Sequence, residues 1–106
     1  MKKSLTYLTL FVSLNALAAP FWGGLDLSLR FSDEAGEELN AQANTYVIGL
    51  ADGLTYAKKA CIPDYVTVKQ LTEMVESFYK QNQQYEKYFA ADVLAEEFFQ
   101  KHYPCE

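Results

Sequence analysis

The sequence predicts an all-α fold: a small antiparallel helical bundle of three to four helices with one disulfide. Apolar residues recur at helical spacing in three successive segments between residue 34 and the end of the chain. The run TVKQ, which begins at Thr67, has the pattern of a helix capping box. The chain also has two cysteines, Cys61 and Cys105, which bracket the second half of the predicted bundle.

Residues 1–18 are predicted to be a signal peptide. Lys2 and Lys3 give a positively charged start, and the mainly apolar run from Leu5 is too short to span a bilayer. Ala16 and Ala18 then occupy the positions that a signal peptidase reads. Cleavage after Ala18 predicts a single-domain mature chain that is exported to the periplasm. The alternatives are an uncleaved membrane anchor and a buried helix.

Residues 19–33 are predicted to form an extended N-terminal arm. Pro20 and the glycines Gly23 and Gly24 interrupt regular structure, and three leucines then alternate with polar residues in a strand-like period. A lone strand has no partner in this chain, so we expect the arm to pack its leucines on the helices. Residues 34–106 are predicted to form the helical domain.

The first helix is predicted to begin at Ser32 or Asp33, where a capping side chain precedes acidic residues. Its apolar face continues to Cys61, which predicts about six or seven turns. Gly49 and Gly53 lie on one side of this helix, where each costs on the order of 1 kcal/mol relative to alanine. That cost predicts close approach by a neighbouring helix or by a second chain. A ligand pressed against bare backbone is the functional alternative.

The second helix is predicted to start at the Thr67 capping box, after Pro63 has ended the first. Its buried stripe is predicted to comprise Val68, Leu71, Met74, Val75, Phe78 and Tyr79, with Thr72 on the solvent side. A polar link at residues 81–84 leads to the third helix, which Pro104 ends. The apolar face of the third helix is predicted to comprise Ala91, Leu94, Ala95, Phe98, Phe99 and His102.

Cys61 and Cys105 are predicted to form a disulfide. A domain this small is marginal on apolar burial alone, and paired cysteines in an exported chain typically form a bridge. The spacing is 105 − 61 = 44 residues, and closing such a loop stabilises a fold by roughly 4 kcal/mol in the chain-entropy model. A zinc site is disfavoured because two cysteines and one histidine are too few to close it.

The charge of the chain limits its partners. There are 9 basic and 14 acidic residues, and removal of Lys2 and Lys3 leaves 7 against 14, a net charge of −7. Such a surface repels phosphate backbones and anionic lipid, so we expect neither nucleic acid nor a membrane as a partner. A basic protein partner would suit it, although ordinary solubility is the simpler explanation.

The residues do not suggest an enzyme. Nucleophilic catalysis needs a nucleophile, a base and an orienting group, and His102 is the only histidine. Asp92, Glu96 and Glu97 are interpreted as the solvent face of an amphipathic helix rather than as paired catalytic carboxylates. Phosphate-binding, dinucleotide-binding and metal-ligand motifs are not found in the sequence. We therefore expect neither catalysis nor a cofactor.

The polar link and the residues after it are the candidate partner-binding loop. Seven of the eight tyrosines belong to the predicted mature chain, and tyrosine is favoured at interfaces because it buries a large area at low entropic cost. Half-buried helix tyrosines with hydrated hydroxyls are the structural alternative. The loop residues proposed to contact a partner are Gln83, Gln84, Tyr85, Glu86 and Tyr88.

Three stretches carry a resemblance to a known family. YVIGLADGL spans residues 46–54, CIPDYVTVKQL spans residues 61–71, and YPC spans residues 103–105. Together they resemble the Rap/Tai family of type VI secretion immunity proteins. The resemblance implies that residues 34–106 form a periplasmic, all-helical immunity-type domain that is bridged through Cys61 and Cys105 and is often a homodimer.

The function implied by the resemblance is inhibition of a toxin. Such proteins bind a secreted peptidoglycan amidase and occlude its active-site cleft. The family link before the last helix often holds a proline, whereas this chain has QNQQYEKYF there. The alternative from another class is an HdeA-like periplasmic acid-stress chaperone, which exposes apolar surface when acid protonates its carboxylates. Dissociation and suppression of aggregation at about pH 2–3 would distinguish the chaperone.

Overall fold

The computed structural model describes residues 21–106, and the predicted signal peptide, residues 1–18, lies outside the described residues. The described part of the chain forms four helices, so the all-α prediction is confirmed. Three are the α-helices α2 (Gly24–Phe31), α3 (Glu37–Tyr56) and α4 (Val68–Gln81).

The fourth helix is continuous over residues 90–102 and is called the C-terminal helix below. It consists of α5 (Ala90–Val93), the π-helical turn η3 (Leu94–Phe99) and α6 (Gln100–His102). Two short 3-10 segments complete the described chain, η1 (Asp33–Ala35) before α3 and η2 (Gln83–Lys87) after α4.

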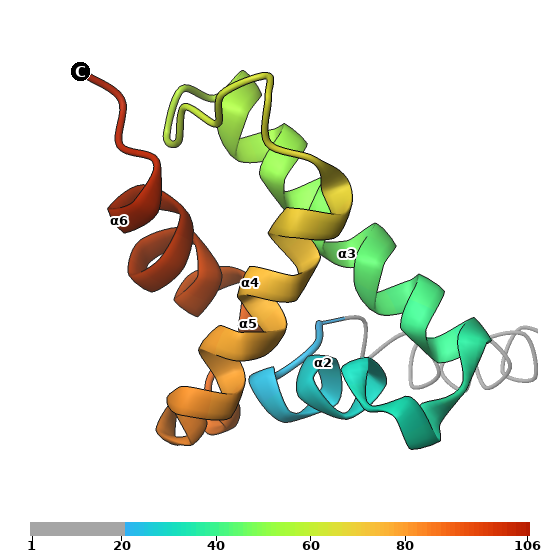
Figure 1. Cartoon of the computed structure of the whole chain (residues 1–106). Coiled ribbons are helices and arrows are strands. Elements are labelled where there is room, and N and C mark those ends of the chain that lie inside the picture. Colours follow the sequence, from blue (N-terminus) through green and yellow to red (C-terminus); the bar gives the residue numbers. More distant parts are fainter. Residues whose placement is uncertain (1–20) are drawn as a thin grey trace, which may run out of the picture.

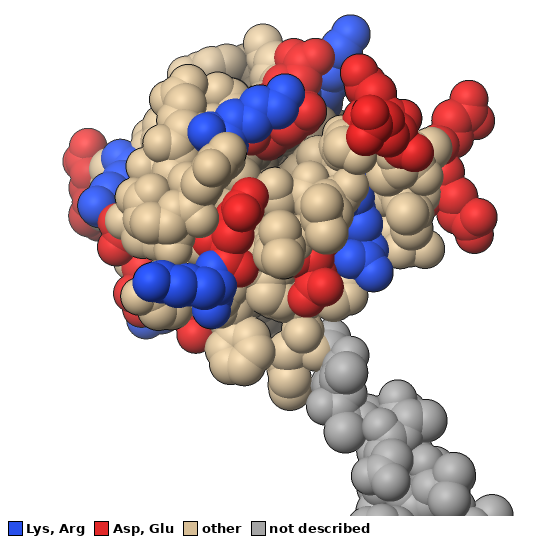
Figure 2. Space-filling view, turned by 90° about the horizontal axis from the view of Figure 1, so that it is seen from below, with Lys and Arg blue, Asp and Glu red and all other residues tan. Residues whose placement is uncertain are grey.

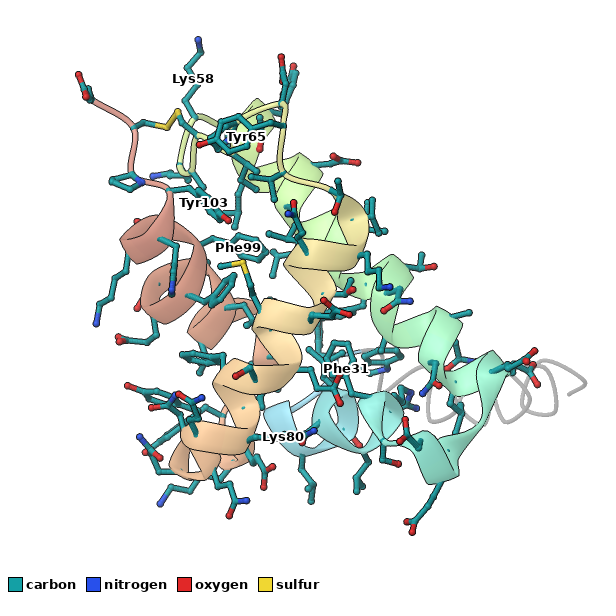
Figure 3. The ribbon with its side chains drawn as sticks, in the orientation of Figure 1. Phe31, Lys58, Tyr65, Lys80, Phe99 and Tyr103 are labelled. Carbon is teal, nitrogen blue, oxygen red and sulfur yellow. A yellow bond between two sulfur atoms is a disulfide. The ribbon has the colours of Figure 1, made fainter. Side chains whose placement is uncertain are left out.

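Helix α4 lies at the centre of the bundle, with α3 on one side and the C-terminal helix on the other (Figure 1). Helix α2 crosses near the C-terminal end of α4 and packs against α3, α4 and η2. Figure 3 shows Phe31 and Phe99 pointing from α2 and η3 toward α4. Each of the four helices places at least one large side chain in the core, and the most buried are Leu27, Val47, Val75, Tyr79, Leu94, Phe98 and Phe99.

The prediction of an extended arm over residues 19–33 is wrong for Gly24–Phe31, which is the helix α2. Leu27 and Phe31 are buried, whereas Leu25 and Leu29 are exposed. Residues four apart lie on the same face of a helix, so Leu27 and Phe31 share one face, and Leu25 and Leu29 share another. Together the two pairs place apolar residues at every second position, which is the period of a strand. Gly23 is the N-cap of this helix, and its backbone N–H donates to Asp26 Oδ2 at 3.0 Å.

Helix α3 is shorter at both ends than predicted. Gly36, with φ at 95°, separates it from η1, so it begins at Glu37. It ends at Tyr56 because Lys58 adopts a left-handed conformation with φ at 59°. The 20 residues make about five and a half turns, and Cys61 lies in the loop that follows.

The glycines Gly49 and Gly53 are not packed against a neighbouring helix in the described part of the chain. A Cβ atom added at either position would meet nothing within 4 Å among the atoms of residues 21–106. The prediction of close approach within the chain is therefore wrong, and approach by a second chain stays a prediction.

The start of α4 matches the predicted capping box. Thr67 N–H donates to Gln70 Oε1 at 2.8 Å, and Gln70 N–H donates to Thr67 Oγ1 at 3.1 Å. Two predictions for the faces of α4 are wrong, because Val68 is exposed and Thr72 is buried. The Thr72 hydroxyl is satisfied locally, since it donates to the carbonyl of Lys69 at 3.1 Å.

Cys61 and Cys105 form the disulfide, with 5.1 Å between their Cα atoms. It joins the loop between α3 and α4 to the end of the chain (Figure 3). A backbone hydrogen bond of 2.8 Å from Cys61 N–H to the carbonyl of Tyr103 holds the same two segments together.

Candidate functional site

The predicted partner-binding loop is a compact segment rather than a flexible link. Residues Gln83–Lys87 form η2, which Asn82 joins to α4 by donating its side-chain N–H to the carbonyl of Phe78 at 2.8 Å. Gln83, Gln84 and Tyr88 are exposed, whereas Tyr85 and Glu86 are half-buried. Three of the five predicted contact residues are therefore exposed to solvent.

Tyr85 anchors the loop to the body of the protein. Its ring stacks on Phe78 with 5.7 Å between centroids, and its hydroxyl donates to Glu97 Oε1 at 3.4 Å. The side chain thus connects η2 to both α4 and the C-terminal helix. Tyr85 holds the shape of the loop instead of projecting from it.

The residues around the start of α2 hold the other end of the loop. Gly24 N–H donates to the carbonyl of Tyr88 at 2.7 Å, and Ala90 N–H donates to the carbonyl of Trp22 at 2.9 Å. These two bonds make an isolated antiparallel bridge between Gly23 and Phe89. The bridge fixes the chain immediately after η2 against the start of α2.

Trp22 fixes this N-terminal segment to the core helices. Its ring stacks on Tyr46 of α3 with centroids 4.8 Å apart, and the Arg30 guanidinium lies 4.1 Å from the centroid of the Trp22 ring. Three elements are therefore joined at one indole ring, which Arg30 shields by a cation–π contact.

The bridge brings exposed aromatic side chains together. We call Phe21, Tyr88 and Phe89 the aromatic patch. Their exposed fractions are 76%, 53% and 58%, and the Phe21 and Phe89 ring centroids are 6.2 Å apart. Neighbouring exposed rings of this size are typical of protein-binding surfaces.

A groove of about 430 Å³ opens beside the patch, and we call it the loop groove. Tyr85, Tyr88 and Phe89 contribute aromatic lining, and the C-terminal helix contributes Asp92, Glu96 and Glu97. The predicted loop and the carboxylates that the sequence assigned to a solvent face thus lie around one hollow.

Glu97 differs from the other two carboxylates because it has a partner. Lys101 Nζ lies 2.7 Å from Glu97 Oε1, one helical turn away. The hydrogen bond from Lys101, followed by its charge and the Tyr85 hydroxyl bond, lowers the Glu97 pKa despite an opposing effect of desolvation. The same pair raises the pKa of Lys101.

Charge is distributed over the surface seen in Figure 2, where both signs alternate with uncharged residues and acidic side chains gather at one end. Among residues 21–106, no group of three His, Cys, Asp or Glu residues is placed to hold a metal ion. Within the same range, no helix combines the length and the apolar character needed to cross a bilayer.

A second groove, of about 720 Å³, lies near the disulfide and is lined by α4 and the end of the C-terminal helix. Tyr65 and Tyr103, both labelled in Figure 3, contribute to its lining. His102 also borders this groove, with Nδ1 2.9 Å from the carbonyl of Phe98. Cys105 is bridged, so the arrangement supplies His102 with no thiol nucleophile.

Sequence reasoning did not identify Phe21 and Phe89 as surface residues of the site. Phe21 lies in the segment predicted to be an extended arm, and its approach to Phe89 depends on a bridge between residues more than 60 positions apart. One weak indication in the sequence that Phe89 belongs to the site is that it directly follows a predicted contact residue, Tyr88.

Comparison with sequence models of known families assigns the chain to a family. The sequence model of the Rap1a immunity proteins matches residues 26–105, which covers α2 from Asp26 and everything after it except the last residue. The chain belongs to the Rap1a immunity protein family. No curated protein and no solved structure matches it.

Family membership confirms the resemblance to Rap/Tai immunity proteins. It implies an immunity protein of type VI secretion that binds a cognate toxin protein, and it indicates an inhibitor rather than an enzyme. It also favours the immunity function over the HdeA-like chaperone alternative.

Proposed function

We propose that this protein is a periplasmic immunity protein that blocks a peptidoglycan amidase delivered by type VI secretion. Segment η2 and the aromatic patch would enter the active-site cleft of the toxin and exclude its peptidoglycan substrate. The observation that carries the proposal is the aromatic patch beside a loop that is fixed at both ends.

The fixed loop suits an inhibitor because binding then requires little ordering. Tyr85 holds η2 from within, and the bridge between Gly23 and Phe89 holds its exit. A surface that is already in its bound shape avoids about 0.5–1.5 kcal/mol of ordering cost for each side chain immobilised. The exposed rings then supply the apolar contact area, as aromatic anchors do in other interfaces.

Export is part of the proposal because the toxin acts on the cell wall. Residues 1–18 would direct the chain to the periplasm and be removed there, which leaves Phe21 close to the new N-terminus. The same compartment permits the disulfide between Cys61 and Cys105.

A homodimer remains an open proposal. The outer face of α3 exposes Gly49 and Gly53, and Tyr56 near its end is 91% exposed. A second copy on this face would explain why two helix-weakening glycines are present. Light scattering of the purified mature chain should then give twice the monomer mass, and a monomer mass at working concentration would contradict the dimer.

The test of function is inhibition by the purified mature chain of the amidase encoded beside its gene. We expect stoichiometric loss of peptidoglycan cleavage. Phe89→Ala should weaken inhibition by about 30-fold if the ring is an interface anchor. Tyr65→Ala is the matched control, since it removes an exposed ring beside the second groove. Unimpaired cleavage with excess wild-type protein would refute the proposal.

A further inference from the structure

The loop groove combines a negative wall with an aromatic wall. We propose that it receives a cationic side chain of the toxin, for which the guanidinium group of arginine is the best chemical match. This inference deepens the proposed function and rests on it, because it assigns the chemistry of one contact within that interface.

The negative wall consists of Asp92 and Glu96, which lie four residues apart on the C-terminal helix and line the groove. Both are exposed, and neither belongs to an ion pair formed within residues 21–106. Glu97, in contrast, is already paired with Lys101. Two carboxylates are thus available to a partner that brings positive charge.

The aromatic wall consists of Tyr85, Tyr88 and Phe89. One of these rings already contacts a cationic side chain of the protein itself. Lys87 Nζ lies 5.7 Å from the centroid of the Tyr88 ring, within the distance at which a cation is attracted to an aromatic face. Lys87 is exposed and lines the same groove. Its ammonium group therefore marks the position that a partner's cation would occupy, and it competes for that position.

Other occupants fit the groove less well. An anionic group would be repelled by Asp92 and Glu96. A purely apolar group would remove these carboxylates from water without pairing them, which is unfavourable. A guanidinium satisfies both walls, because it pairs with carboxylates through two N–H donors and stacks on aromatic rings.

The experiment measures the dissociation constant, Kd, of the complex between the mature chain and the amidase at low salt. The double variant Asp92→Asn/Glu96→Gln is expected to raise Kd by about 10-fold, because two charge pairs are lost. Lys87→Gln is expected to lower Kd by about 3-fold, because it removes a competing cation. Both differences should shrink toward zero at 1 M salt, where the screening length is about 3 Å.

Two controls separate the groove from general charge and from folding. Asp33→Asn/Glu34→Gln changes net charge equally at exposed positions on η1 and should leave Kd unchanged. Tyr88→Leu removes the ring and should raise Kd by about 3-fold, whereas Tyr65→Ala removes an exposed ring outside the loop groove and should leave Kd unchanged. The thermal midpoint of each variant shows whether it is folded.

The outcomes distinguish the inference from the proposed function. If all variants bind and inhibit like the wild type, or if Lys87→Gln weakens binding, the cationic contact is wrong while the inhibitor function stands. If the wild type itself fails to bind the amidase, both are wrong. Opposite shifts for the carboxylate variant and Lys87→Gln, with unchanged controls, support the inference.

Discussion

Gly24 is the glycine at which an added Cβ atom has least room. A Cβ atom there would lie 2.7 Å from the carbonyl oxygen of Tyr85 and 2.8 Å from the Cα of Glu86. Both are backbone atoms of η2, so relief requires movement of the loop itself. Close contact between α2 and η2 therefore depends on glycine at this position.

We predict that Gly24→Ala lowers the free energy of unfolding by about 1–3 kcal/mol, as overpacking typically does, and that it weakens toxin inhibition by displacing η2. Urea denaturation measures the first effect. Gly53→Ala is the control, because its Cβ would meet nothing within 4 Å and alanine in a helix interior is favoured by about 0.5–1 kcal/mol. Equal effects of the two substitutions would contradict the close contact.

Tyr79 carries a buried hydroxyl without a hydrogen-bond partner among residues 21–106. Burial raises the pKa of this phenol, and the negative charges that Tyr46 and Glu86 would carry raise it further. A pKa above the unfolded value of 10.0 means that folding favours the protonated form. The contribution of this pKa shift to the free energy of unfolding is fully present below pH 10.0 and is lost as the pH rises through the folded-state pKa.

We therefore predict that Tyr79→Phe leaves stability unchanged at neutral pH or raises it by about 1 kcal/mol. It should also make unfolding less sensitive to alkali above pH 10.0. Urea midpoints measured at neutral and alkaline pH test both effects. A loss of stability at neutral pH would show that the hydroxyl makes a bond in solution.

Helix α4 depends on its capping box, since Thr67 and Gln70 satisfy each other's backbone N–H groups. Thr67→Ala should lower the free energy of unfolding by about 1 kcal/mol. Thr67→Ser keeps the hydroxyl and should retain most of that stability. Thermal unfolding of the two variants compares them directly, and identical losses would mean that the hydroxyl is unimportant.

The C-terminal helix contains the Glu97–Lys101 pair, which also reaches η2 through Tyr85. The lowered pKa of Glu97 means that the folded state favours its charged form. That contribution is present above pH 4.5 and is lost as the pH falls through the folded pKa.

We predict that Lys101→Met raises the Glu97 pKa toward 4.5, because the first cause of the shift is the Lys101 hydrogen bond. NMR titration of the Glu97 carboxyl carbon measures this. Lys80→Met removes a lysine from the other helical ion pair and should leave the titration of Glu97 unchanged. An unshifted Glu97 in Lys101→Met would contradict the pairing.

The helices show which parts of the fold can be predicted from the sequence. Local signals predicted α3, α4 and the C-terminal helix, since apolar spacing and the Thr67 capping box need no distant residue. Helix α2 was missed because Leu25 and Leu29 occupy a different face from Leu27 and Phe31. The face of α4 was misjudged at Thr72, whose hydroxyl is buried after bonding to its own helix.

The candidate site was predicted only in part, for a similar reason. The polar link drew attention to η2, and Tyr88 is exposed as expected. The inward direction of Tyr85 and the placement of Phe21 beside Phe89 depend on tertiary contacts. A sequence pattern carries no signal for a single bridge between distant segments.

At the scale of the whole molecule, the disulfide and segment η2 of the proposed binding surface lie at opposite ends of α4 (Figure 3). Cys61 belongs to the loop that precedes α4, and Cys105 is bonded to it there. Segment η2 follows the other end of the helix. The bridge should therefore stabilise the fold without shaping the aromatic patch.

We predict that Cys61→Ser/Cys105→Ser lowers the free energy of unfolding by roughly 4 kcal/mol, the loop-closure value for 44 residues. Wild-type protein treated with a reductant should lose a similar amount, whereas the variant should not respond to the reductant. Urea denaturation with and without reductant measures both. An unchanged wild-type midpoint would show that the bridge does not stabilise the protein.

The same variant tests which end of the molecule binds the toxin. Its folded fraction should keep a Kd close to the wild-type value, because η2 follows the opposite end of α4 from the loop that holds Cys61. The second groove lies beside the bridge. Loss of the bridge would therefore change the positions of Tyr65 and Tyr103, which line that groove, before it changed η2. Calorimetric titration under conditions where the variant is folded separates affinity from stability. A large loss of affinity in folded protein would place the toxin at the second groove instead of the loop groove.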